Sequence, residues 1–169
     1  NNLRDIYTKR RYAPDKIWNF DETGITNVQA PTRVVAETGR KQVGQVTSLE
    51  RGILVTMGAF INAIGNTVPP VFVFPRTRTL QDLGHGAPAG SLILGNKSGW
   101  MTADIFPLVL EHFQQHTNCS PENPVLLILD NHGSHCTLDA IVKARDLGID
   151  MLSYPPHTSH RLQVLDVTV

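Results

Sequence analysis

Three aspartates that are far apart along the chain could together bind divalent metal ions. Asp130 directly follows the apolar run Val125–Leu129, and Asp21 ends the alternating segment Lys16–Phe20. Two carboxylates that face one crevice repel each other, and without a counter-charge one of them would hold a proton. A Mg²⁺ ion removes this cost, because it prefers one or two carboxylates together with phosphate oxygens and water. Asp166, after a Pro-containing loop, is the third candidate.

The strands that would position these aspartates belong to a mixed sheet. The continuous apolar run before Asp130 is typical of a strand buried on both faces, and the carboxyl ends of such strands carry ligand chemistry in α/β sheets. Residues 52–62 and 67–74 are rich in β-branched and aromatic residues and flank the turn Gly65-Asn66, which predicts an antiparallel hairpin. Further strands are expected at residues 16–21 and 149–154, with a turn at Glu22-Thr23-Gly24.

Two helices are expected to pack on this sheet. The first would begin with Thr102 as its N-cap. The second would begin at Ser134 or Thr137, end at Gly148, and bury one face, formed by Leu138, Ile141, Val142 and Ala144. Residues 25–50 and 75–100 are expected to be long loops. Strand–helix–strand units imply parallel pairing, so the sequence predicts an α/β fold with a mixed sheet, an antiparallel hairpin and flanking helices.

Composition and charge set limits on the function. The chain has 169 residues, of which 41% are hydrophobic and 18% charged, as expected for one globular domain. No apolar run approaches the length of a membrane span, so no membrane partner is expected. The net charge is zero, although residues 1–97 are net basic and residues 98–169 net acidic. Cys119 and Cys136 share no metal-type spacing and are expected to be free thiols.

The three segments that carry the aspartates form distinct blocks. They read Asn19-Phe-Asp21-Glu-Thr-Gly24, Leu129-Asp130-Asn-His-Gly-Ser-His135 and Pro155-Pro-His-Thr-Ser-His160-Arg-Leu-Gln-Val-Leu-Asp166. With Ser98-Gly-Trp-Met-Thr102, these blocks resemble the DDE transposases of the mariner–pogo group, and most closely the pogo, tigger and jerky-like branch. One block alone would be weak evidence, but three in order with fitting spacing are fairly specific. The resemblance covers nearly the whole chain, so residues 1–169 are expected to form a single catalytic domain.

The resemblance implies a ribonuclease-H-like fold with Asp21, Asp130 and Asp166 as the acidic triad. It implies two Mg²⁺ or Mn²⁺ ions and phosphodiester chemistry on DNA, in which strands are cleaved at transposon ends and then transferred to target DNA. Two metals about 3.5–4 Å apart can stabilise both the attacking and the leaving oxygen of an in-line displacement. The full-length protein is expected to be a homo-oligomer that binds transposon ends and target DNA. A nuclear location follows only from the DNA substrate.

The chain departs from the family pattern in three respects. Val164 stands where this branch usually has proline, which is expected to loosen the turn that presents Asp166. The chain begins with Asn1 and stops soon after Asp166, so we expect a fragment. It would lack the amino-terminal helix-turn-helix DNA-binding region and the carboxy-terminal helix that carries the third aspartate.

Several polar residues near the aspartates are candidates for a supporting role. Asn131, His132 and His135 could orient the loop, contact phosphate or cap the next helix, and direct metal ligation is the less favoured interpretation. His157 and His160 could contact the DNA backbone or simply line their loop. Trp100 is expected to pack at the start of its helix, with base stacking as the minor alternative.

Two other functions stay open on the sequence alone. A domesticated descendant could keep the fold and bind DNA or partners without catalysis, which a full acidic triad disfavours. The second is an unrelated Mg²⁺-dependent nuclease or phosphatase on a similar sheet. Asp-x-His also occurs in metallophosphatases, but the other histidines of this chain show no matching grouping.

Overall fold

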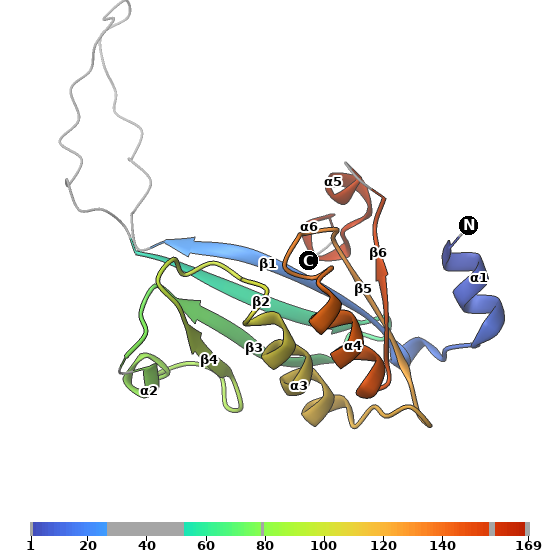
Figure 1. Cartoon of the computed structure of the whole chain (residues 1–169), viewed down its shortest axis with the longest axis horizontal. Helices are drawn as coiled ribbons and strands as arrows, with labels where there is room; N and C mark the ends of the chain where they lie inside the picture. Colours follow the sequence, from blue (N-terminus) through green and yellow to red (C-terminus); the bar gives the residue numbers. More distant parts are fainter. Residues whose placement is uncertain (1, 27–52, 79, 156–157, 168–169) are drawn as a thin grey trace, which may run out of the picture.

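A six-stranded mixed sheet forms the centre of the computed structural model, which describes residues 2–26, 53–78, 80–155 and 158–167. The strand order is β4-β3-β2-β1-β5-β6 (Figure 1). The strands are β1 (Ile17–Thr26), β2 (Leu54–Asn62), β3 (Thr67–Phe74), β4 (Leu92–Gly95), β5 (Val125–Leu129) and β6 (Ile149–Ser153). β2 pairs antiparallel with β1 and β3, whereas the pairs β3–β4, β1–β5 and β5–β6 are parallel. The predicted mixed sheet with an antiparallel hairpin is therefore confirmed.

Helices flank both faces of this sheet. They are α1 (Asn2–Lys9), the 3₁₀ turn η1 (Pro14–Lys16), α2 (Leu80–Leu83), α3 (Phe106–Thr117), α4 (Leu138–Asp146), α5 (Ser159–Leu162) and α6 (Val164–Val167). Figure 1 shows α3 and α4 side by side on one face of the sheet, with α5 and α6 near the end of β5. Because α6 also contacts β1, the last segment of the chain returns to the centre of the sheet.

An aromatic cluster fixes β1 against α3. Phe20 is fully buried, and its ring centroid lies 4.5 Å from that of Phe60 and 5.9 Å from that of Phe106. Phe60 in turn stacks on Phe113 at 4.8 Å. Aromatic pairs at these separations add to the free energy of area burial. Since side chains alternate along a strand, burial of Phe20 on the α3 side turns the next residue, Asp21, toward the other face.

Two predicted loops are in part regular structure. The turn expected at Glu22-Thr23-Gly24 is wrong, because β1 continues to Thr26 and stays paired with β2 up to Leu54. Pairing with a neighbouring strand outweighs the local turn preference of these residues. The long loop predicted for residues 75–100 contains α2 and β4, and β4 extends the sheet by pairing with β3. The loop predicted for residues 25–50 falls, apart from its first two residues, outside the described residues.

Both helices differ in detail from their predictions. α3 starts at Phe106 rather than directly after Thr102, which acts through its carbonyl by accepting hydrogen bonds from two later N–H groups. In α4, Thr137 is the N-cap, as one of the two predicted caps, and its hydroxyl accepts a hydrogen bond from the N–H of Ala140. Of the predicted buried face only Ala144 is confirmed, because Ala140 and Ala144 face the core while Leu138, Ile141 and Val142 are exposed.

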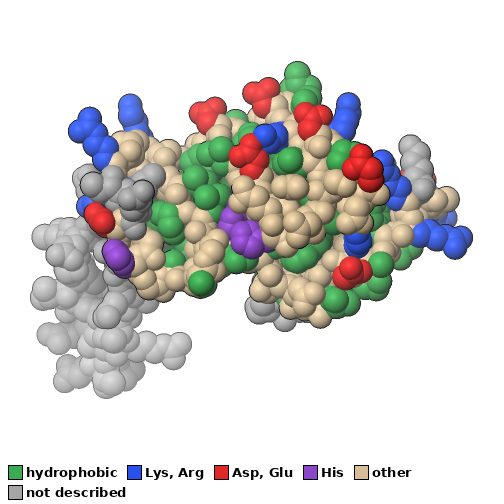
Figure 2. Space-filling model, turned by 90° about the horizontal axis from the view of Figure 1, so that it is seen from below, with side chains coloured by type: hydrophobic (Ala, Val, Ile, Leu, Met, Phe, Trp, Pro, Cys, Tyr) green, Lys and Arg blue, Asp and Glu red, His purple; other side chains and the backbone are tan. Residues whose placement is uncertain are grey.

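Membrane-spanning helices are absent from the described part of the chain. The longest helix within the described ranges, α3, has 12 residues, and none of these helices has the length and apolar character needed to cross a bilayer. Figure 2 views the molecule from below and shows acidic and basic side chains interspersed with apolar ones on that face. The two cysteines are free thiols as predicted, Cys119 buried and Cys136 exposed.

Replacing Gly148 with alanine is expected to lower the free energy of unfolding by about 3 kcal/mol or more. Gly148 follows α4 with a φ of +75°, as its predicted role as helix stop requires, and a Cβ there would overlap the backbone carbonyl of Ser120. Chemical denaturation of the two proteins would measure the difference. Gly65→Ala is the matched control, since Gly65 has a φ of +89° but no neighbour within 4 Å. Equal losses for both variants would contradict the steric argument.

Candidate active site

Asp21 and Asp130 lie at the same end of the sheet and line one pocket of about 240 Å³. β1 and β5 are parallel neighbours, with Asn19 opposite Ile128. Continued by two residues, this register places Asp21 beside Asp130. The structure thus brings together the two aspartates that the sequence placed at the ends of neighbouring strands. His132, His135 and Trp100 line the same pocket.

The buried Gln163 holds the third sequence block, residues 155–166, against β1 next to Asp21. Gln163 is 1% exposed, accepts a hydrogen bond from the side-chain amide of Asn19 at 2.6 Å, and donates one to the carbonyl of Phe20 at 3.1 Å. The Leu165 N–H donates to the side-chain oxygen of Asn19 at 3.4 Å. Buried amides are stable only when they are paired in this way. This Asn19–Gln163 pair was missed by the sequence analysis, although both residues stand inside the quoted blocks.

Asp166 lies in α6 and acts on Asp21 through its charge. Burial raises the pKa of Asp21 to about 6, and the charge of Asp166 adds to the rise, while hydrogen bonds from the Glu22 N–H and the Gln163 side chain oppose it. A raised pKa in a cleft is typical of carboxylates that need a counter-charge. Asp166 itself is exposed. Its membership of a metal-binding triad remains a prediction.

His135 joins Asp130 to Glu22 beneath the pocket. Its side chain is 3% exposed, its Nε2 lies 2.8 Å from Glu22 Oε1 in a hydrogen bond, and its Nδ1 lies 2.8 Å from Asp130 Oδ1. The contact with Asp130 is poorly directed for a hydrogen bond, so we treat it as an ion pair. The imidazole also packs 4.4 Å from the ring of Phe106. These contacts fix the ring from three sides.

The contact between His135 and its acidic neighbours raises the pKa of His135 and lowers the pKa of Asp130. Burial alone would lower the pKa of His135, but the contacts with Asp130 and Glu22 raise it to about 9. The His135 imidazole in turn holds the pKa of Asp130 below its usual range, although burial acts against this. The His132 N–H assists by donating to Asp130 Oδ1 at 3.1 Å. Asp130 is therefore kept as a carboxylate, while Asp21 is poised to take up a proton or a cation.

The remaining candidates have different surroundings. His132 is exposed, and its Nδ1 lies 2.7 Å from the hydroxyl of Ser134. Asn131 is also exposed and accepts a hydrogen bond from the Cys136 thiol at 3.2 Å. His157 lies outside the described residues, and for His160, which belongs to α5, only the backbone is described. Glu22, which the sequence suggested only as part of a turn, is the partner of His135.

The residues in the pocket fit a hard divalent cation in their chemistry. Asp21 and Asp130 supply carboxylate oxygens, the ligands that Mg²⁺ and Mn²⁺ prefer. Burial and the nearby charge of Asp166 raise the pKa of Asp21, and a bound cation would favour its carboxylate form. In the part of the chain that the structure describes, no group of three or more His, Cys, Asp or Glu side chains is placed to hold one ion. The fit therefore rests on the pair of aspartates.

Millimolar Mg²⁺ is expected to raise the melting temperature more at about pH 8 than at about pH 5. The pKa of Asp21 is about 6 in the folded protein against an ordinary 3.8, so its carboxylate destabilises the fold above pH 6. This destabilisation is lost as the pH falls through about 6, because the folded state then binds the proton. Thermal unfolding with and without Mg²⁺ at both pH values measures the effect. Asp21→Asn should abolish the difference, and a variant that keeps it would contradict this account.

The family follows from a comparison with known sequences. Residues 52–169 match the sequence model for the DDE superfamily endonuclease. The chain belongs to this family. It is 29% identical over 172 residues to the human Pogo transposable element with KRAB domain, covering 98% of this chain and 27% of that protein. A protein of Cochliobolus lunatus named MFS-type transporter clz9 is 32% identical over 165 residues, which cover 94% of this chain and 18% of that protein.

Solved structures show the same fold for this DDE endonuclease domain. A pre-cleavage Mos1 transpososome superposes with a TM-score of 0.59 at 13% identity, covering 98% of this chain and 43% of that one. The Mos1 strand transfer complex gives a TM-score of 0.55, also at 13% identity, covering 90% and 38%. The resemblance to the mariner–pogo group and the ribonuclease-H-like fold are thus confirmed. The chain spans about a quarter or less of the curated relatives named above.

Proposed function

We propose that the protein to which this chain belongs cleaves DNA strands at transposon ends and transfers them to target DNA, with the pocket at Asp21 and Asp130 as the active site. The observation that carries the proposal is that these two carboxylates, from neighbouring parallel strands, share one pocket. The family match supports endonuclease chemistry. Asp166, held next to Asp21 by the docked third block, is proposed as the third acidic residue.

Asp21, Asp130 and Asp166 are proposed to hold two Mg²⁺ or Mn²⁺ ions. When bound, such ions neutralise phosphate charge and make water a stronger nucleophile. Structures of Mos1 paired-end complexes have been solved with Mn and with Mg, which supports this choice. The raised pKa of Asp21 suits the site, because a cation would stabilise the carboxylate that burial disfavours.

The residues of this chain contribute positioning and charge rather than a nucleophile. Phosphoryl transfer depends mainly on placement of the reacting oxygens and on charge neutralisation. Asp130 is held as a carboxylate by His135, and its Oδ1 is further fixed by the N–H of His132. The buried Phe20 and Phe106 rings keep the imidazole in place. The side chains that face the phosphate are thereby arranged before the substrate arrives.

The proposed partners are transposon-end and target DNA, and a second copy of the full-length protein. A Mos1 transposase has been solved as a paired-end complex with the left transposon end, which supports DNA as the ligand. Two ends that are processed together would require at least two copies of the protein. A nuclear location is proposed because genomic DNA is the substrate.

The test is cleavage of a labelled duplex that carries the element's terminal repeat by the full-length protein. Strand cleavage is expected with Mg²⁺ or Mn²⁺ and is expected to be absent with EDTA. Binding of this duplex without cleavage under any of these conditions would contradict catalysis and favour a domesticated DNA-binding role. Hydrolysis of small phosphate esters without cleavage of DNA would instead favour a phosphatase.

A further inference from the structure

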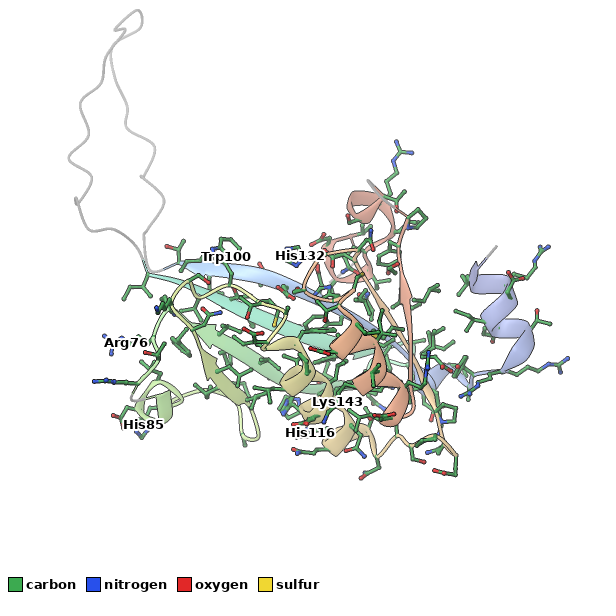
Figure 3. The ribbon with its side chains drawn as sticks, in the orientation of Figure 1. Arg76, His85, Trp100, His116, His132 and Lys143 are labelled. Carbon is green, nitrogen blue, oxygen red and sulfur yellow. The ribbon has the colours of Figure 1, made fainter. Side chains whose placement is uncertain are left out.

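An indole ring stands exposed at the mouth of the aspartate pocket. Trp100 is 56% exposed, whereas Met101, the next residue, is 4% exposed and packs in the core. Figure 3 shows Trp100 and His132 at the same end of the sheet, on the two loops that flank the pocket. The expectation that Trp100 packs at the start of its helix is wrong, because Met101 and Ile105 fill that position. A large aromatic side chain left in solvent beside a site needs another explanation.

The loop that carries Trp100 is held in one conformation by its own hydrogen bonds. The side-chain oxygen of Asn96 accepts from the N–H groups of Ser98 at 3.0 Å and Gly99 at 2.6 Å. The Asn96 amide donates to the carbonyl of Trp100 at 2.7 Å. From the sheet, the buried hydroxyl of Thr56 donates to the carbonyl of Gly99 at 2.7 Å. The backbone that carries the indole is thus fixed on both sides of Gly99.

Gly99 makes this close support possible. Its φ is +77°, which disfavours any other residue, and a Cβ would lie 2.8 Å from the carbonyl oxygen of Leu54. The loop therefore lies directly against β2, and Trp100 follows at the pocket edge. Because the backbone of this loop is already ordered, binding through Trp100 would cost little backbone entropy.

The residues that line the pocket indicate which kind of ligand the Trp100 indole would bind. Asp21, Glu22 and Asp130 make the pocket acidic, so these side chains would bind an anionic ligand only through a bound cation. The flat apolar face of Trp100 needs no cation to bind a ligand. Under the proposed function a DNA phosphate enters the pocket, and the bases next to it come within reach of the rim. Stacking of a base on an aromatic ring contributes about 1–3 kcal/mol and tolerates any base.

We propose that Trp100 stacks on an unpaired nucleobase of the DNA strand whose phosphate enters the aspartate pocket. The base must be unpaired, because a base within a duplex already has both faces covered. Trp100 is then a binding residue that holds the strand at the site, separate from the groups proposed to bind metal. This inference rests on the proposed function, because it takes DNA as the ligand.

The test is a cycle that combines changes in the protein with changes in the DNA. The full-length protein is titrated, with Ca²⁺ in place of Mg²⁺, with a labelled duplex that ends in a short unpaired overhang. Trp100→Ala is expected to weaken binding roughly 5- to 150-fold, and Trp100→Phe by much less. An abasic site is then moved through the overhang one position at a time. At one position it should weaken wild-type binding and remove the difference between wild type and Trp100→Ala.

Ile64→Ala provides the matched control for this test. Ile64 is 59% exposed and lies in the β2–β3 turn, at the opposite end of the sheet from the pocket. Its truncation should leave binding unchanged. The proposal is overturned if Trp100→Ala has no effect, or if its effect is the same with every abasic position.

Failure of this proposal can be told apart from failure of the proposed function. Cleavage with Mg²⁺ but no abasic-dependent effect of Trp100→Ala would overturn the stacking alone. An abasic-dependent effect without cleavage under Mg²⁺ or Mn²⁺ would support the stacking and contradict catalysis. A full-length protein that binds no DNA at all would overturn both.

Discussion

Replacing Asp130 with asparagine is expected to reduce DNA cleavage by the full-length protein by about a thousand-fold or more, with the fold unchanged. Asparagine keeps the shape and one oxygen, so the N–H of His132 still has its acceptor. The carboxylate charge is lost, and a neutral amide is a weak ligand for Mg²⁺. Loss of about 4 kcal/mol of transition-state stabilisation corresponds to a thousand-fold lower rate.

Single-turnover cleavage of the terminal-repeat duplex measures this effect, and thermal unfolding checks the fold. Asp146→Asn is the matched control, since Asp146 is an exposed residue at the end of α4, away from the pocket lining. The same chemical change there should leave the rate within about two-fold. Asp130→Asn with undiminished cleavage would remove Asp130 from the active site.

Replacing His135 with alanine is expected to reduce cleavage by about 10- to 100-fold, the usual effect of losing a residue that orients a metal ligand. His135 lines the pocket but is only 3% exposed and contacts Asp130, so we assign it a positioning role through Asp130. An asparagine at 135 places its amide nitrogen near the position of Nδ1, which contacts Asp130, and a glutamine places its nitrogen near Nε2, which contacts Glu22. Asparagine should therefore restore more activity than glutamine.

The Mg²⁺ concentration that gives half-maximal cleavage separates positioning from a general loss of stability. It should rise for His135→Ala and return toward the wild-type value for His135→Asn. Phe106→Leu is the matched control, because Phe106 packs on the imidazole but has no polar contact with Asp130. That variant should melt earlier without changing the Mg²⁺ requirement. A rise in the requirement for Phe106→Leu equal to that of His135→Ala would contradict the positioning role.

The two central aspartates could be placed from the sequence because each follows a strong local signal. The run Val125–Leu129 has no polar interruption and reads as a central strand, and Asp130 necessarily follows its carboxyl end. The length of β1 could not be read in this way. Glu22-Thr23-Gly24 has the composition of a turn, and only pairing with β2, which is distant in sequence, keeps it extended.

The contacts Glu22–His135 and Asn19–Gln163 were harder to predict, since each joins residues more than 100 positions apart. Side chains alternate along β1, so Glu22 lies on the same face as the buried Phe20. This was the one sign in the sequence that the Glu22 carboxylate turns inward, where it contacts His135. The exposed position of Trp100 had no comparable sign, because a tryptophan before a helix is most often buried. In α4, the spacing of Leu138, Ile141 and Val142 imitates a buried face.

The pairing of Thr26 with Leu54 closes the β1–β2 ladder at the point where the connection between the two strands begins and ends. Both strands reach this point as direct neighbours, so the intervening residues leave and rejoin the framework at adjacent positions. Each doubling of such a connection adds only about 0.6 kcal/mol of loop-closure free energy. A change in the length of the connection between Thr26 and Leu54 is therefore expected to cost little stability and to leave the strand ends at the pocket in place.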